Sequence, residues 1–404
     1  MIAQANYAYD PVGNRTTLTD LAGDHSFTYD ALSRLTGAIH PAPSGLVPEG
    51  FVYDPVGNRT RSHLSTTHVY DAANRLFEDD AFTYTYDANG NRQTKTDKLT
   101  GATTTYTYDV DNQLVTLHSP LVTAQYRYDA LGRRIEKTVN GTATRFRYDQ
   151  EDLLLETTQS GTLRARWTHG PGLDEPLLME RDRNTNGTFE ATERVTYHAD
   201  GLGSIVALTG SSGQVVERYT YDSFGTPRLT GPGPDGQMDT PDDVTLTQSA
   251  FGNPYLFTGR EYDPESGLYF YRARYYDPRT GRFLQEDPIG GDGVHPTQHR
   301  MSMPGVTPSR TSTPWACMGR TVASTTGSGV LRRVGRTTVF RRRLRVRASS
   351  TIQIQTRSEM MTLRVGLAAS GSVYKIAMLR MLEEQYGKIG AVLNRVGLLG
   401  RMAH

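Results

Sequence analysis

The chain has little cysteine and no long apolar run. Cys317 is the single cysteine among 404 residues, so neither an intrachain disulfide nor a cysteine-based zinc finger can form. No stretch of about 18 apolar residues occurs, so the sequence predicts no membrane-spanning helix. Residues 1–6 lack a basic flank followed by an apolar core. We therefore expect no signal peptide here, and export would depend on another sequence or another protein.

Aspartate is absent from residues 294–404. This part holds 18 Lys and Arg against 3 Asp and Glu, a net charge of +15. Residues 1–293 hold 26 against 40, a net charge of −14, together with 21 of the 23 tyrosines. The overall charge of +1 therefore hides two parts of opposite charge. A change this abrupt marks a boundary near residue 293.

The first part is an array of repeats. The dipeptide Tyr-Asp recurs at intervals of 16 to 24 residues, with tyrosine at positions 9, 29, 53, 70, 86, 108, 128 and 148. Four copies extend into a longer motif with glycine and arginine, at residues 9–15, 53–59, 86–92 and 128–134.

Each repeat has the pattern of a β-hairpin. Residues before the aspartate alternate with period two, as in Phe82–Tyr86, which is a strand signal. The aspartate side chain can bond to nearby backbone amides and so ends the strand. A glycine three residues later indicates a turn with positive φ, and an arginine then begins the return strand. One hairpin cannot bury its own face, so stacked hairpins would form a long, open or spiralling sheet.

The repeats, and a further series of motifs, resemble the Rhs/YD-repeat family of bacterial surface and toxin proteins. The downstream motifs are similar to the Rhs repeat-associated core domain; they lie at residues 198–209, 213–225, 257–263, 267–278 and 281–290. The resemblance covers about residues 1–293. It implies a β-strand spiral that forms a hollow shell around a variable C-terminal toxin. It also implies self-cleavage near the end of the core, with paired aspartates.

From these observations we expect an all-β fold of stacked hairpins in an open or partial shell. The expected domains are a YD-repeat array at 1–160, a core-associated region at 161–293 with extra loops at 182–193 and 231–246, and a weakly ordered basic tail at 294–404. We expect a structural role, in which the shell packages or presents a C-terminal toxin, in a secreted or cell-surface setting. The partners expected are that effector or the remainder of the shell.

A polar loop carries the spacing of a calcium site. In residues 182–193, oxygen-bearing side chains occupy positions 1, 3, 5 and 12 and glycine occupies position 6. The predicted ligands are Asp182, Asn184, Asn186 and Glu193. The flanking residues indicate strands where an EF-hand would have helices. The alternative is a polar hairpin loop without metal, and calcium is the one cofactor that the sequence suggests.

Asp287 is the candidate catalytic residue. It matches the aspartate of the family's closing Asp-Pro-x-Gly segment, one of the acids implicated in self-cleavage. Two carboxylates that share a proton are the chemistry of an aspartic protease. The alternative is that Asp287 caps the turn before Pro288. The second acid and the rest of the cleavage motif are missing, so we expect no enzyme in this form.

The tail is compatible with a shifted reading frame. Met and Trp each have a single codon, and it ends in G. In a reading shifted by one base, this G becomes the first base of the next codon, so the codons at positions 316 and 319 must both encode glycine. With permitted third bases the shifted run through 301–319 ends in Asp-Pro-Met-Gly-Met-Tyr-Gly, close to the family's cleavage motif. We hypothesise a frameshift between about residues 290 and 296, which the gene sequence would test.

Two other functional classes stay open. The tyrosine-rich strand faces would suit carbohydrate or a cell surface. The arginines around residues 332–347 would suit phosphates of nucleic acid, and hence a nuclease-type toxin. No catalytic set accompanies that basic cluster, because the histidines of the tail are scattered and aspartate is absent.

Overall fold

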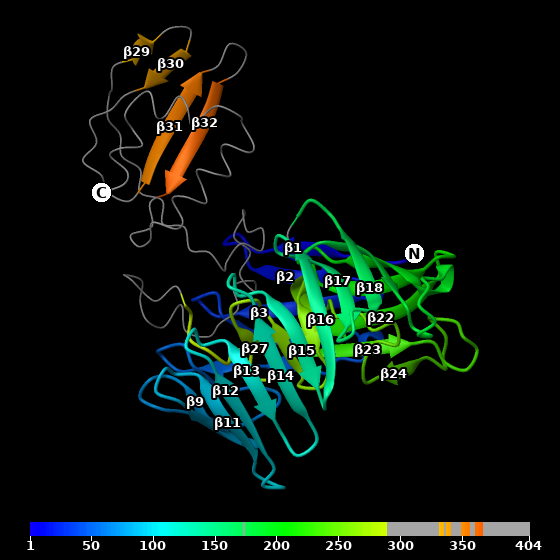
Figure 1. Cartoon of the computed structure of the whole chain (residues 1–404). Helices are drawn as coiled ribbons and strands as arrows, with labels where there is room; N and C mark the ends of the chain where they lie inside the picture. Colours follow the sequence, from blue (N-terminus) through cyan, green and yellow to red (C-terminus); the bar gives the residue numbers. More distant parts are fainter. Residues whose placement is uncertain (173, 289–330, 335–336, 341–348, 356–359, 367–404) are drawn as a thin grey trace. The chain divides into compact units, whose positions relative to one another are not determined.

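The computed structural model describes residues 1–172, 174–288, 331–334, 337–340, 349–355 and 360–366 (Figure 1). The chain divides into two compact units between Met318 and Gly319, and each is described by itself. The regular elements of the described residues are strands and short 3-10 turns, so the expected all-β class is confirmed. None of the helical turns in this described part is long and apolar enough to cross a membrane.

The first repeats form a small N-terminal sheet of five antiparallel strands. Its elements are β1 (Asn6–Tyr9), β2 (Arg15–Thr19), β3 (Asp24–Tyr29), β4 (Leu35–Ile39), the 3-10 turn η1 (Ala42–Ser44) and β5 (Glu49–Gly50). A separate two-stranded hairpin follows, made of β6 (Val52–Tyr53) and β7 (Arg59–Arg61).

The later repeats and the first half of the core region form one large sheet of consecutive strands. Its members are β8 (His68–Tyr70), β9 (Leu76–Asp79), β10 (Phe82–Tyr86), β11 (Arg92–Asp97), β12 (Thr103–Tyr108), β13 (Leu114–His118), β14 (Thr123–Tyr128), β15 (Arg134–Val139), β16 (Thr142–Asp149), β17 (Asp152–Thr158), β18 (Leu163–His169), β19 (Pro176–Arg181), β20 (Arg194–Ala199), β21 (Ile205–Gly210), β22 (Val215–Tyr221), β23 (Pro227–Gly231) and β24 (Val244–Leu246). The turn η2 (Ala191–Glu193) precedes β20.

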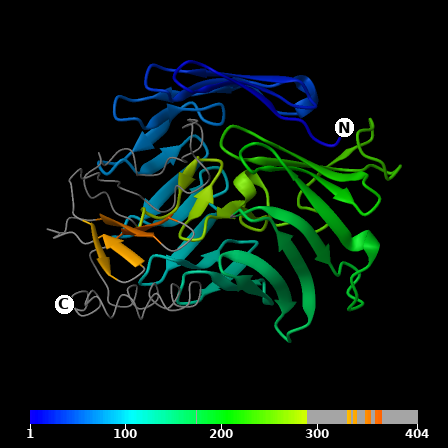
Figure 2. The same cartoon turned by 90° about the horizontal axis from the view of Figure 1, so that it is seen from above.

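This sheet curves into a barrel-like wall. Its paired residues join strands that are consecutive in the chain, from β8 and β9 through to β23 and β24. Figure 2 shows the N-terminal sheet along one side of the wall. Its Tyr7 hydroxyl accepts a hydrogen bond from the Gly201 amide at 2.9 Å, and its Phe51 ring meets that of Phe224 with 5.2 Å between centroids.

The turn of each repeat forms as the sequence predicts. In the hairpin of β10 and β11, Asp87 Oδ1 accepts hydrogen bonds from the amides of Asn89 (2.9 Å) and Asn91 (2.8 Å). Gly90 has a φ of +83°, a conformation that a side chain would strain. The glycines of the other extended copies also have positive φ: Gly13, Gly57 and Gly132. The Asp-x-x-Gly segment therefore fixes the turn through local hydrogen bonds and one left-handed residue.

The tyrosine of the repeat bonds one hairpin to the one before it. In eight hairpins its hydroxyl donates a hydrogen bond of 2.5 to 2.9 Å to a backbone carbonyl, and the acceptor is the first residue of the preceding return strand. The donors are Tyr29, Tyr53, Tyr70, Tyr86, Tyr108, Tyr128, Tyr148 and Tyr221. Each ring is partly buried, so the hydroxyl needs such a partner. The repeat therefore carries its own connection to its neighbour.

The last part of the core region lies inside the curved wall. We call residues 253–288 the inner segment; it contains η3 (Phe257–Gly259), β25 (Glu261–Asp263), β26 (Leu268–Phe270), β27 (Tyr275–Asp277) and β28 (Arg282–Phe283). Figure 2 shows it, in yellow-green, surrounded by the strands of the wall. The family resemblance predicts a hollow shell, but here the inner segment fills the space that the wall encloses.

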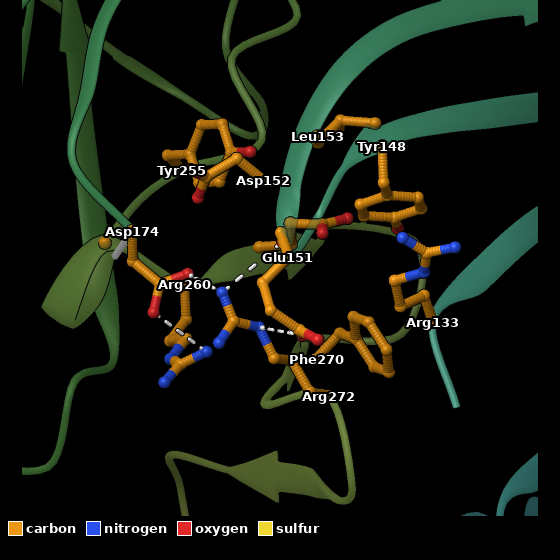
Figure 3. A pocket seen from close by; sticks show the side chains of 12 residues that line it. Arg133, Tyr148, Glu151, Asp152, Leu153, Asp174, Tyr255, Arg260, Phe270 and Arg272 are labelled. Carbon is orange, nitrogen blue, oxygen red and sulfur yellow. Dashed lines mark hydrogen bonds and ion pairs between the residues drawn. The ribbon is translucent and has the colours of Figure 1, made fainter. Parts of the chain in front are cut away.

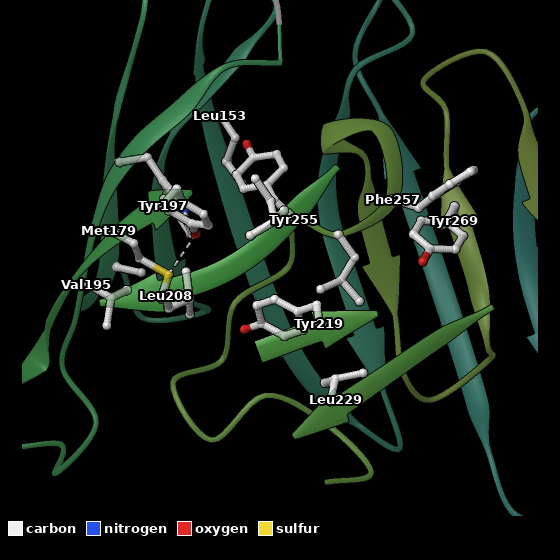
Figure 4. Close-up of a cluster of buried hydrophobic side chains, with 14 of the residues drawn as sticks. Leu153, Met179, Val195, Tyr197, Leu208, Tyr219, Leu229, Tyr255, Phe257 and Tyr269 are labelled. Carbon is white, nitrogen blue, oxygen red and sulfur yellow. Dashed lines mark hydrogen bonds between the residues drawn. The ribbon is translucent and has the colours of Figure 1, made fainter. Parts of the chain in front are cut away.

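The hydrophobic core forms where the inner segment meets the wall. One cluster joins inner residues such as Tyr255 and Tyr269 to wall residues such as Met179 and Leu208 (Figure 4). A second cluster packs Phe270 and Tyr275 against the strands around Leu114 and Tyr126. Tyr269 and Tyr276 are fully buried. Burying such large rings provides much of the driving force for closing the wall on the inner segment.

The second unit is described only through four strands. They are β29 (Leu331–Val334), β30 (Thr337–Phe340), β31 (Ser349–Gln355) and β32 (Met360–Gly366), and they form an antiparallel sheet. The rest of the tail, including the segments on which the frameshift hypothesis rests, lies outside the described residues. The predicted domain boundaries at 160 and 293 stay predictions.

Candidate functional site

The arginine that begins a return strand reaches inward to the inner segment. Arg92 donates from Nη1 to Asp277 Oδ2 at 2.6 Å. Arg134 donates from Nη1 to Asp263 Oδ2 at 2.5 Å and from Nη2 to Glu261 Oε2 at 2.7 Å. Both arginines are 1% exposed. The sequence analysis placed these arginines at the strand starts but did not identify their partners, which lie far along the chain.

Because these ion pairs are buried, each charged group strongly shifts the pKa of its partner. Burial works to raise the pKa of Asp277, but Lys95 and Arg92 outweigh it and lower that pKa to about 2. Burial works to lower the pKa of Arg134, but the charge of Asp263 outweighs it and raises that pKa well above its usual value. Removing one partner would therefore leave a buried charge without compensation.

Around Arg134 the acids outnumber the cations. Lys137 Nζ contacts Asp263 Oδ1 at 2.8 Å and Glu265 Oε1 at 3.0 Å. Two cations thus face three carboxylates. Burial, followed by the charge of Asp263, raises the pKa of Glu265. Burial also raises the pKa of Glu261, against the effect of Arg134. The five side chains form a structural network in which each buried charge is stabilised by an opposite charge beside it.

A small cavity beside this network is too small for a substrate. Figure 3 shows the side chains that line it, from the wall and the inner segment. Asp174 receives two guanidinium groups, from Arg260 at 3.0 Å and from Arg272 at 2.8 Å. The cavity holds about 20 Å³, which is room for about one water molecule. We find no catalytic geometry in this cavity among the described residues.

Asp287 lies at the end of the inner segment beside a cation. Its Oδ2 is 3.1 Å from Arg274 Nη2, and its side chain is 20% exposed. Arg274 in turn stacks on the ring of Phe283, with 3.8 Å between its guanidinium carbon and the ring centroid. The second acid that the family resemblance implies would follow residue 288, outside the described residues. A catalytic role for Asp287 therefore stays a prediction.

The predicted calcium ligands come together in one loop between β19 and β20. Both carboxylates are buried and already accept hydrogen bonds from amides of the loop. Asp182 bonds to the amides of Asn186 and Gly187, and Glu193 bonds to those of Arg183, Asn184 and Glu190. Burial works to raise the pKa of Glu193, but these amide bonds outweigh it and lower that pKa. The strands expected on either side of the loop are confirmed.

Calcium binding by this loop stays a prediction with a direct test. We expect calcium titration of the whole chain to release or absorb heat with a dissociation constant of about 0.1–1 mM, as in extracellular calcium modules. Glu193→Gln should abolish the heat, whereas Asp235→Asn, in a second polar loop, should not. If the chain gives no heat with calcium and its melting temperature does not change with a chelator, the prediction is wrong.

The sequence analysis missed a cluster where the N-terminal sheet, the hairpin of β6 and β7 and the end of β22 meet. Glu49, His63 and Asp222 each place a ligand atom within 4.8 Å of the others. The available signal was the concentration of histidine, since four of the ten histidines lie within residues 25–68. The contact with Asp222 could not be found from the sequence, because it spans more than 150 residues.

Comparisons with known proteins agree with the architecture. The Teneurin YD-shell family profile matches residues 12–302. The tRNA nuclease WapA of Bacillus subtilis (strain 168) is 34% identical over 295 residues, covering 71% of this chain and 10% of that protein. The Double-stranded DNA deaminase toxin A of Burkholderia cenocepacia (strain H111) is 27% identical over 312 residues, covering 71% of this chain and 21% of that protein.

The solved structures that match are more distant. The crystal structure of TcdB2-TccC3 has a TM-score of 0.37 and 17% identity, covering 76% of this chain and 19% of that chain. This chain therefore spans between a tenth and about a fifth of these three proteins. The family profile covers most of this chain, and the repeat hairpins carry the motifs that first suggested the Rhs/YD-repeat resemblance. The chain belongs to the Teneurin YD-shell family.

Proposed function

We propose that this chain is part of a structural shell that holds and presents a C-terminal effector. The observation that carries the proposal is the burial of the inner segment as far as Gln285, close to its end. Leu284 is completely buried, and its amide and carbonyl bond to Tyr275 and Arg92 at 2.8 Å each. Gln285 accepts a hydrogen bond from the Tyr275 amide. A segment that follows residue 288 is therefore attached within three residues of the buried Gln285, while Pro288 itself is exposed.

The relatives support a carrier role. Their names describe different activities, a tRNA nuclease and a double-stranded DNA deaminase, while the matched region is the shared one. A common shell joined to different effectors would account for this pattern. This chain spans only a part of those proteins. The presence of an effector, secretion and a cell-surface location therefore belong to the proposal, which names no particular effector.

The other functions weighed from the sequence have less support. Carbohydrate binding would need a row of exposed aromatic rings, but Tyr9 is the only exposed tyrosine in the described residues. A nuclease in the basic tail concerns residues that are largely outside the described part. Self-cleavage needs the second acid beyond Asp287.

A site-specific protease tests the proposal. We would insert its recognition sequence after Pro288 in one protein and after Thr100, in the turn between β11 and β12, in a control. Leu99 in that turn is 94% exposed, so the control sequence is accessible. Cleavage after Pro288 should be slower by about tenfold or more, because the chain is anchored at the buried Leu284 and Gln285 just before the insertion. Equal cleavage rates in two proteins with the same melting temperature would contradict the proposal.

A further inference from the structure

A buried carboxylate of the N-terminal sheet has one oxygen with three hydrogen bonds and the other with none. Glu49 Oε1 accepts hydrogen bonds from His40 Nε2 (2.8 Å), the Ser223 amide (2.9 Å) and the Ser223 hydroxyl (2.8 Å). Glu49 Oε2 is buried and has no hydrogen-bond partner. The side chain is 1% exposed. These contacts hold the carboxylate in one orientation, with Oε2 buried on the side of His63.

A second ligand atom faces the same place. His63 Nδ1 is also buried and without a hydrogen-bond partner, and it lies 3.8 Å from Glu49 Oε2. That distance is too long for a hydrogen bond. The His63 ring is held edge-on against Phe51, with 5.9 Å between centroids. Two unsatisfied polar atoms so close together in the interior are costly unless another group lies between them.

The third member brings a second negative charge. One carboxylate oxygen of Asp222 lies within 4.8 Å of the ligand atoms of Glu49 and His63. Asp222 Oδ1 caps its own turn by accepting bonds from the amides of Phe224 and Thr226. The carboxylates of Asp222 and Glu49 thus lie close together in the interior, where like charges repel. A cation placed among the three groups would remove this repulsion.

We propose that Glu49, His63 and Asp222 bind a divalent transition metal ion of the zinc class. One imidazole nitrogen and two carboxylate oxygens are ligands that zinc accepts, and the nitrogen disfavours calcium and magnesium. Zinc ligands lie about 2.0–2.2 Å from the metal, which puts two ligand atoms about 3.4 Å apart in a tetrahedral site. Glu49 Oε2 and His63 Nδ1 are 3.8 Å apart and all three ligand atoms lie within 4.8 Å, so the site needs a contraction of about 0.4 to 1.4 Å. His40 bonds to the other oxygen of Glu49 and so orients it, which is the usual role of a residue that is hydrogen-bonded to a metal ligand.

The position of the site gives it a structural role. Glu49 lies in β5 of the N-terminal sheet, His63 follows β7, and Asp222 follows β22 of the large sheet. The metal would join the N-terminal sheet to the far end of the wall, where strand pairing does not connect them. Metal binding would therefore stabilise closure of the wall.

Zinc titration of the metal-free whole chain tests the site. Glu49→Gln and Asp222→Asn keep a hydrogen-bond acceptor but lose the charge of a ligand. The matched control is Asp54→Asn, because Asp54 Oδ1 caps a repeat turn in the same way, by bonding to the Asn58 amide at 2.7 Å. The expected result is one zinc ion per chain, a higher melting temperature with zinc, and affinity weakened by about 100-fold in both ligand variants but not in the control.

Three results would overturn the proposal. One is the absence of zinc binding to the chain, and another is unchanged zinc affinity in Glu49→Gln or Asp222→Asn, which would place the metal elsewhere, for example in the tail. The third is an equal loss of affinity in Asp54→Asn. Circular dichroism of the metal-free variants shows whether they fold, and His63→Ala provides a further ligand variant if one of them does not.

Discussion

Arg134→Met should lower the free energy of unfolding by about 3–5 kcal/mol. Methionine fills much of the same space but leaves Asp263 and Glu261 without their guanidinium partner in a buried environment. Asp263 is 1% exposed, so water cannot replace the lost hydrogen bonds. Urea denaturation, followed by circular dichroism at neutral pH, measures the effect.

Arg133→Met is the matched control, because Arg133 is the neighbouring residue in the chain but forms its ion pair with a local, partly exposed acid. Arg133 pairs with Asp129 at the surface, where the two side chains are 23% and 22% exposed. Such pairs contribute below about 1 kcal/mol. A similar loss of stability in both variants would mean that the inward pairing has no special importance.

Gly225→Ala should destabilise the chain by about 3 kcal/mol. Gly225 is the last residue of the turn after β22 and has a φ of +92°, a conformation that costs a residue with a side chain about 1–2 kcal/mol. A Cβ atom there would also overlap the buried ring of Phe257 in the inner segment. Overpacking of a core adds about 1–3 kcal/mol. The expected loss therefore combines backbone strain with a clash between wall and inner segment.

Gly57→Ala separates these two effects. Gly57 occupies the same place in a repeat turn, with a φ of +93°, but no atom lies within 4 Å of its added Cβ. It should lose only the backbone cost of about 1 kcal/mol. The difference between the variants, measured by thermal or urea unfolding, reports the packing of Phe257. If the two losses are equal, that contact does not contribute.

The local structure of the repeats could be predicted because its causes are local. Alternation, the aspartate and the glycine act within a few residues, and the structure has the hairpins, the Asp87 hydrogen bonds and the positive φ of Gly90 that they predict. The strands on either side of residues 182–193 followed from the same kind of pattern.

The long-range contacts could not be predicted in the same way. The partner of Arg134 lies 129 residues further along the chain, and that of Arg92 lies 185 residues further. Which residues meet depends on how far the sheet curves, and this is the sum of many small twists between strands. The approach of Glu49 to Asp222 has the same origin. Sequence motifs therefore gave the repeat unit, while the inner network and the metal cluster required the structure.

Hydrogen exchange of the inner segment tests the central claim most directly. The claim is that residues 253–288 are held inside the wall by buried arginine pairs and aromatic packing. The amides of Tyr275 and Leu284 are both hydrogen-bonded and buried, so they should exchange on the order of 1000-fold more slowly than those of the exposed turn around Leu99. Arg134→Met should reduce this protection, and Arg133→Met should not. Exchange at Tyr275 and Leu284 as fast as in that turn would contradict the account.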